Sequence, residues 1–137
     1  MRILGIDYGD SRVGFAISDL MGWTAQALST LNEKDMNKVI KKVKEIVNEY
    51  KVEKIVVGFP KNMNGTIGPR GELTNEFIKK LKESIDSVEI ISWDERLSTV
   101  AATRTLNETN VRGKKRKAVL DTVAASYILQ GYLDSIK

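Results

Sequence analysis

The chain has 137 residues, the size of one domain, and its 42% hydrophobic and 29% charged residues are an ordinary globular mixture. It contains neither cysteine nor histidine, which excludes disulfides, thiolate metal sites and the commonest general base. Catalysis must therefore use carboxylates, amines, hydroxyls or a hard metal ion. The 22 basic and 18 acidic residues give a net charge of +4, which is compatible with a polyanionic partner.

The first part of the chain predicts a β-hairpin, a further strand and a helix. Residues 1–7 are rich in Ile and Leu, turn residues follow, and residues 12–18 alternate with the period of a strand. Residues 23–31 predict a third, shorter strand. Residues 34–50 predict an amphipathic helix, because apolar side chains recur at helical spacing while lysines cover the other side.

The remainder predicts alternating strands and helices. The expected strands are 54–59 and 88–93, the helices are 72–85, 98–107 and 118–133, and a polar loop (60–71) and a basic loop (110–117) lie between them. This order predicts an α/β fold in which a mixed five-stranded sheet carries helices on both faces. We expect one domain over residues 1–137, with Trp23 and Trp93 in its core.

Three carboxylates occupy positions that suit a site at the carboxyl ends of parallel strands. Asp7 ends the first strand, Glu95 follows the last strand, and Asp121 borders the apolar face of the last helix. Each has an ordinary alternative. Asp7 can accept a backbone hydrogen bond at the turn, Asp94 and Glu95 can precede a helix N-terminus, and Asp121 can pair with Lys117.

Taken together, three such acids would repel one another unless they were protonated or neutralised by cations. Without histidine, an oxygen-rich cluster suits Mg²⁺ or Mn²⁺. Two such ions can activate water and stabilise the leaving oxygen when a phosphodiester is cleaved. We therefore predict that Asp7, Glu95 and Asp121 are both metal ligands and catalytic residues.

Basic residues gather near these acids. Five of the six residues in 112–117 are basic and come just before Asp121, so they would hold a phosphate backbone; the alternative is a solvated run of charge. The loop after residue 59 adds cations that could reach phosphates, although it would also suit an ordinary surface loop. The predicted nucleic-acid-binding residues are Lys61, Asn62, Arg70, Arg96, Arg112, Lys114, Lys115, Arg116 and Lys117.

Five motifs occur in order over nearly the whole chain. They are Gly5-Ile6-Asp7-Tyr8-Gly9 with Arg12-Val13-Gly14, the run from Gly58 to Gly65, Gly68-Pro69-Arg70, the run from Asp94 to Thr99, and Asp121 through Ala124-Ala125 to Gln130. Together they resemble the YqgF family of bacterial Holliday-junction-resolvase-like proteins, also described as nucleases that process the precursor of small-subunit ribosomal RNA.

The resemblance implies a ribonuclease H-like fold, a divalent-metal-dependent phosphodiesterase and a cytoplasmic location, with the acidic site at Asp7, Glu95 and Asp121. Junction-resolving relatives in the wider superfamily carry their second acid at the end of the fourth strand. Here that place holds Gly58-Phe59-Pro60, so Glu95 from the next strand would substitute.

The leading hypothesis is a nuclease that acts on structured RNA in the processing of pre-16S rRNA, as a monomer or weak homodimer. No stretch is apolar enough to span a membrane, and no signal peptide begins the chain, so we expect no membrane partner. The alternatives are a junction-resolving nuclease of branched DNA, which normally needs a symmetric dimer, and a non-catalytic nucleic-acid-binding module. A sugar kinase or actin-like ATPase would need a second, similar domain.

Overall fold

A computed structural model describes residues 2–60, 65–95 and 114–136, and the side chains of all of these except 114–122. The described elements are, in chain order, β1 (Arg2–Tyr8), β2 (Arg12–Ser18), β3 (Ala25–Asn32), α1 (Met36–Tyr50), β4 (Val52–Phe59), α2 (Pro69–Ser84), β5 (Glu89–Asp94) and α4 (Lys114–Ser135).

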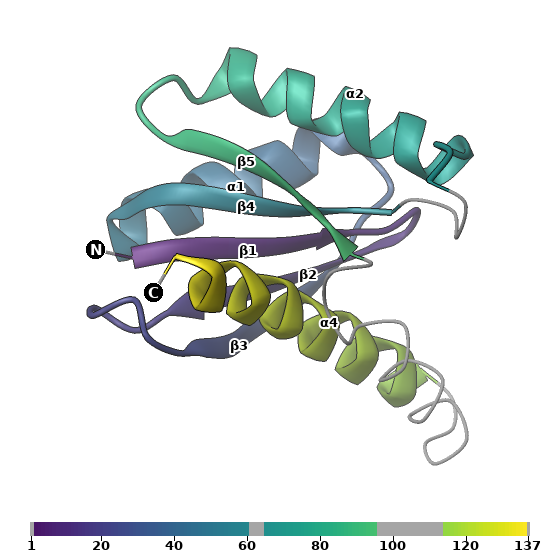
Figure 1. Ribbon diagram of the computed structural model, residues 1–137. Coiled ribbons are helices and arrows are strands. Elements are labelled where there is room, and N and C mark those ends of the chain that lie inside the picture. The colour runs from purple at the N-terminus through teal and green to yellow at the C-terminus, as the bar shows by residue number, and fades with distance from the viewer. Residues whose placement is uncertain (1, 61–64, 96–113, 137) are drawn as a thin grey trace.

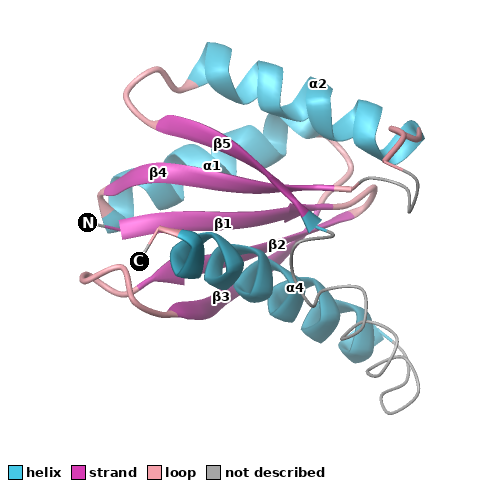
Figure 2. Ribbon diagram, viewed as in Figure 1, coloured by secondary structure: helices cyan, strands magenta, loops and turns pink. Residues whose placement is uncertain are grey.

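The strands form the mixed five-stranded sheet that the sequence predicts (Figure 2). Its order is β3-β2-β1-β4-β5. The β1–β2 and β2–β3 pairs are antiparallel, whereas β4 runs parallel to both β1 and β5. The carboxyl ends of β1, β4 and β5 therefore meet at one edge of the sheet, the edge at which ligands bind in open α/β sheets.

Helices cover both faces of the sheet, as Figure 1 shows. Successive side chains of β1 point to opposite faces of the sheet. Leu4 and Ile6 belong to the hydrophobic cluster with α1 and α2, whereas Ile3 packs in the cluster under α4. Asp7, in phase with Ile3, consequently belongs to the α4 face.

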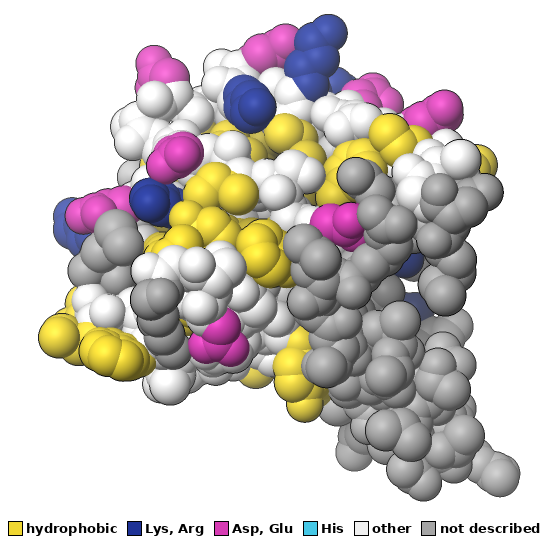
Figure 3. All heavy atoms as spheres, viewed as in Figure 1, with side chains coloured by type: hydrophobic (Ala, Val, Ile, Leu, Met, Phe, Trp, Pro, Cys, Tyr) yellow, Lys and Arg dark blue, Asp and Glu magenta, His cyan; other side chains and the backbone are white. Residues whose placement is uncertain are grey.

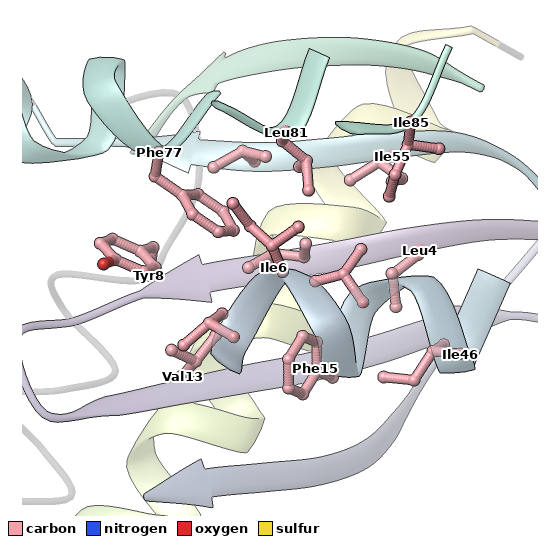
Figure 4. Close-up of a cluster of buried hydrophobic side chains, with 14 of the residues drawn as sticks. Leu4, Ile6, Tyr8, Val13, Phe15, Ile46, Ile55, Phe77, Leu81 and Ile85 are labelled. Atoms are coloured by element: carbon pink, nitrogen blue, oxygen red, sulfur yellow. The ribbon is translucent and has the colours of Figure 1, made fainter. Parts of the chain in front are cut away.

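An aromatic stack fixes α2 against the end of β1 (Figure 4). The rings of Tyr8 and Phe77 lie nearly parallel, 4.2 Å apart between centroids at an interplanar angle of 10°. Phe77 is fully buried and Tyr8 nearly so. This contact holds the middle of α2 beside the strand end that carries Asp7.

Local signals explain the turn from α1 into β4. The Asp35 carboxylate caps α1 by accepting a hydrogen bond from the backbone N–H of Asn37. At the other end, Lys51 adopts a left-handed backbone conformation with φ of 56°, and its N–H donates to the carbonyl of Val47. The chain then reverses at once into Val52, the first residue of β4.

Several predicted boundaries are wrong. The helix expected at residue 72 begins at Pro69, because the fixed φ of proline suits a first helical turn. Residues 114–117 were expected in a loop, yet their backbone belongs to α4, since a run of Lys and Arg has good helix propensity. Strand β3 has eight residues and is not shorter than its neighbour β2, with which it pairs from end to end. The helix predicted over 98–107 lies outside the described residues.

Trp23 is not in the core, contrary to prediction. Its side chain is 56% exposed, next to the exposed Leu20 and Met21. Figure 3 shows hydrophobic side chains gathered over this β2–β3 loop. The loop is held by polar contacts instead, since the backbone N–H of Trp23 donates to Oδ1 of Asp19 over 2.7 Å. Trp93 is half-buried, and its ring meets that of Tyr132 edge to face.

Within the part of the chain that the structure describes, no helix is both long and apolar enough to cross a membrane.

Candidate active site

Asp7 lies near the carboxyl end of the central strand β1, between β2 and β4. Its side chain is only 2% exposed, and its Oδ1 atom is shielded from solvent. The turn that follows is closed by the backbone, where the N–H of Gly9 donates to the carbonyl of Arg12 over 2.9 Å. A carboxylate in such a place is costly to bury without compensating charge, which marks it as a candidate for cation binding.

Glu95 follows directly on β5, and its carboxylate lies over the neighbouring strand β4. A Cβ built on Gly58 would stand 3.2 Å from Oε1 of Glu95, and that oxygen is also shielded from solvent. Ile6 of β1 pairs with Val57 of β4. The next residue on β1 is Asp7 and the next on β4 is Gly58, so these two residues lie beside each other. The structure therefore brings Asp7 and the Glu95 carboxylate to neighbouring strand ends on one face of the sheet.

Asp121 belongs to α4, which crosses this face in the direction opposite to β1 (Figure 1). Ala125 lies over Gly5, because a Cβ on that glycine would be 3.1 Å from the Ala125 carbonyl oxygen. Gln130, further along α4, accepts a hydrogen bond from the N–H of Ala25 at the far end of the sheet.

Asp121 precedes Ala125 by four residues, about 6 Å along α4, and Asp7 follows Gly5 by two residues, about 7 Å along β1. The backbone of Asp121 therefore lies toward the end of β1 that carries Asp7. Its side chain is outside the described residues. Among the side chains that are described, no three His, Cys, Asp or Glu groups could hold a metal ion.

Arg70 approaches Asp7 from the first turn of α2. Its Nη2 atom lies 3.8 Å from Oδ1 of Asp7, and its side chain is 41% exposed. The turn is packed closely against the end of β4, because a Cβ on Gly71 would be 3.0 Å from the carbonyl oxygen of Pro60. Sequence reasoning assigned Arg70 to nucleic acid and missed this ion pair, which no spacing along the chain signals.

A polar hollow of about 220 Å³ adjoins Arg70. Its other lining residues come from the β1–β2 turn, and they are Gly9, Asp10, Ser11 and Arg12. Arg12 had been given no role from the sequence, although it follows the strand that carries Asp7 by a few residues. A larger hollow of about 400 Å³ lies between α1 and α2, where no candidate carboxylate stands.

The other predicted nucleic-acid-binding residues cannot be placed against the site. Four of them lie outside the described residues: Lys61, Asn62, Arg96 and Arg112. The backbone of Lys114, Lys115, Arg116 and Lys117 forms the start of α4, while their side chains are not described. These roles therefore stay predictions.

The sequence is similar to proteins of one family over almost its whole length. The family model described as RuvX, Holliday junction resolvase, matches residues 1–135. A protein of Acetivibrio thermocellus, named "Putative pre-16S rRNA nuclease", is 58% identical over 98% of this chain and 96% of its own length. A Bacillus cytotoxicus protein of the same name is 56% identical over 98% of this chain and 99% of its own length.

Solved structures share the fold at low sequence identity. RuvC of Thermus thermophilus in complex with a Holliday junction superposes with a TM-score of 0.62, at 11% identity, covering 100% of this chain and 97% of RuvC. The fowlpox virus Holliday junction resolvase gives a TM-score of 0.56 at 15% identity, covering 98% of this chain and 99% of the resolvase. The chain thus belongs to the RuvX (YqgF) family, and it is a nuclease with a ribonuclease H-like fold.

Proposed function

We propose that this nuclease hydrolyses phosphodiester bonds of structured RNA and processes the precursor of 16S rRNA. The observation that carries the proposal is the placing of Asp7 and the Glu95 carboxylate at neighbouring strand ends, on the face that α4 crosses. The relatives named for pre-16S rRNA support the substrate. Its place of action is then the cytoplasm, and residues 1–137 form one nuclease domain.

The side chains at these strand ends suit Mg²⁺ or Mn²⁺. Both ions prefer carboxylate oxygens, and Oδ1 of Asp7 and Oε1 of Glu95 are held away from solvent. Asp121 supplies the third carboxylate from α4, and the chain has no histidine or cysteine that would favour a softer metal. When bound, such ions supply an activated water and stabilise the leaving oxygen.

The protein's own residues position these groups. The stack of Tyr8 on Phe77 packs α2 against the end of β1 that carries Asp7. Gly58 leaves the space that the Glu95 carboxylate occupies. The predicted nucleic-acid-binding residues would contact the phosphate backbone and set its register without reading sequence. They are Lys61, Asn62, Arg70, Arg96, Arg112, Lys114, Lys115, Arg116 and Lys117.

The test is cleavage of a transcript that carries 16S rRNA with its precursor flanks, in Mg²⁺ or Mn²⁺. We expect the wild-type chain to cleave it and Asp7→Asn to be at least about 100-fold slower, the scale of losing a charge-stabilising group. Asp86→Asn is the matched control, because Asp86 is an exposed carboxylate in the α2–β5 loop. Equal cleavage by wild type and Asp7→Asn would overturn the proposal.

A second candidate is the resolution of four-way DNA junctions, favoured by the description of the family model and by the RuvC fold. Resolution needs two active sites on one junction and hence a symmetric dimer. RNA processing needs only one active site, so a monomer or weak homodimer could carry it out. Sedimentation with and without junction DNA, beside the same Asp7→Asn comparison on both substrates, separates the two functions. Binding without cleavage in either metal would leave a nucleic-acid-binding module.

A further inference from the structure

We infer that Arg70 is an exchangeable counter-ion, which neutralises Asp7 in the metal-free protein and turns to a phosphate of the nucleic acid when a divalent cation binds Asp7. The inference rests on the proposed function, since it takes Asp7 as a metal ligand. It assigns the hollow beside Arg70 as the subsite for that phosphate, with Arg12 as its second cation.

The contact between Arg70 and Asp7 is one of charge and is easily broken. The two atoms stand 3.8 Å apart, whereas a charge-assisted hydrogen bond between these groups would be about 2.8 Å long. Nothing in that geometry locks the guanidinium to the carboxylate. A cation that binds the carboxylate directly can therefore displace it.

The two partners differ in their freedom to move. The Asp7 carboxylate is 2% exposed and sits on the central strand, whereas the Arg70 side chain is 41% exposed. The backbone at Arg70 is fixed, because its carbonyl accepts a hydrogen bond of 2.9 Å from the hydroxyl of Thr74. Exchange thus needs only rotation of the arginine side chain, with α2 in place.

The hollow offers the displaced guanidinium a second partner. Arg70 and Arg12 both line it, and Asp10 is the one acid among its lining residues. While Arg70 pairs with Asp7, its charge is directed to that carboxylate rather than to an anion in the hollow. When a divalent cation takes Asp7, two guanidinium groups face one carboxylate, and a guanidinium pair matches phosphate oxygens in geometry.

The exchange couples two binding events through one side chain. A cation at Asp7 repels Arg70 and makes the phosphate subsite, and a phosphate in that subsite draws Arg70 from Asp7 and opens the metal site. By reciprocity, each ligand must strengthen the other by the same factor. Arg70 therefore acts as a positioning residue whose removal has opposite effects on the two ligands.

The experiment compares wild type, Arg70→Gln and the control Arg2→Gln. Arg2 lies at the other end of β1, stacked over the ring of Tyr50, so the control removes the same charge away from the site. Calorimetry measures Mn²⁺ binding without RNA. Anisotropy of a fluorescent RNA hairpin, read within seconds of mixing with Ca²⁺ and before cleavage accumulates, measures RNA binding.

We expect Arg70→Gln to bind Mn²⁺ about 5-fold more tightly and, in Ca²⁺, to bind the hairpin about 5-fold more weakly, the lower end of ordinary coupling between sites. Arg2→Gln should match wild type in both. If Arg70→Gln bound both Mn²⁺ and the hairpin more weakly, Arg70 would have a merely structural role. If its RNA binding were unchanged, Arg70 would only repel the cation at Asp7. Either result overturns the inference. Neither readout requires cleavage, so failure of the proposed RNA processing would be seen separately, in the Asp7→Asn comparison.

Discussion

Gly58 in β4 and Ile128 in α4 touch so closely that no side chain fits between them. A Cβ added to Gly58 would stand 2.4 Å from Cδ1 of Ile128 and 3.2 Å from Oε1 of Glu95. Gly58 therefore contributes both to the close approach of α4 to the sheet and to the space beside the Glu95 carboxylate. A substitution at Gly58 would therefore affect both the stability of the fold and the candidate site.

Gly58→Ala should consequently lower both the stability of the protein and its rate of cleavage. We expect the free energy of unfolding to fall by about 1–3 kcal/mol, the usual cost of forcing a methyl group into a packed interior. We also expect cleavage to fall, because the new methyl group displaces the Glu95 carboxylate. Urea denaturation and RNA cleavage at a temperature where both chains are folded measure the two effects.

The double variant Gly58→Ala with Ile128→Val separates these effects. Removing the Ile128 Cδ1 methyl relieves the closer of the two contacts, so part of the lost stability should return, less the ~1 kcal/mol that Ile→Val ordinarily costs. Cleavage should stay low, because the contact with Glu95 persists. Full recovery of cleavage in the double variant would mean that the Glu95 position does not depend on Gly58.

A buried hydroxyl stabilises the opposite end of the sheet. Oγ of Ser18 accepts a 2.8 Å hydrogen bond from the backbone N–H of Ile3, and Ser18 is 1% exposed. Ser18→Ala leaves that donor buried without an acceptor, so we expect a loss of about 1–3 kcal/mol in the free energy of unfolding. Thermal denaturation measures it.

Ser29→Ala is the control for this change, because Ser29 lies exposed on β3 and should shift stability by less than about 0.5 kcal/mol. Cleavage by the folded Ser18→Ala chain should equal that of wild type, since Ser18, on β2, contacts Ile3 at the end of β1 that is far from Asp7. A cleavage defect there would imply that the two ends of β1 are coupled.

Much of the fold could be predicted because its signals are local. The alternation of residues 12–18, the apolar run of β4 and the helical spacing of α1 each act within a few residues of sequence, and the structure confirms all three elements. The predictions were wrong where one local pattern was compatible with two structures. Trp23 is apolar but lies in a turn held by Asp19, and a run of basic residues is compatible with helix as well as loop.

The candidate site was predictable only in part. Asp7 and Glu95 could be predicted to lie near one edge of the sheet, because both come at the carboxyl ends of strands and those ends meet at one edge when the strands are parallel. Arg70 beside Asp7 was not predictable, since that contact depends on how α2 packs against Tyr8 through Phe77. The space at Gly58 likewise becomes meaningful only when Ile128 is known to cover it.

The Tyr8 hydroxyl predicts a loss of stability at alkaline pH. Burial raises the pKa of Tyr8 above its ordinary value of 10.0, and the charges of Glu76, Asp10 and Asp35 raise it further. Because the folded chain holds this proton more tightly, the unfolded chain ionises first as the pH rises. Tyr8 therefore contributes its full stabilisation below about pH 10 and loses it as the pH rises toward the folded-state pKa.

Tyr8→Phe removes this titration and keeps the ring that stacks on Phe77. The two chains differ by one hydroxyl, so the other titrating groups cancel when their unfolding free energies are subtracted. We expect that difference to be constant from about pH 7 to 9 and then to move in favour of Tyr8→Phe above about pH 10. Urea denaturation at matched pH values measures it. A difference that stays constant to about pH 11 would mean that the folded protein does not hold the Tyr8 proton more tightly, and that the stack with Phe77 leaves the hydroxyl in contact with water.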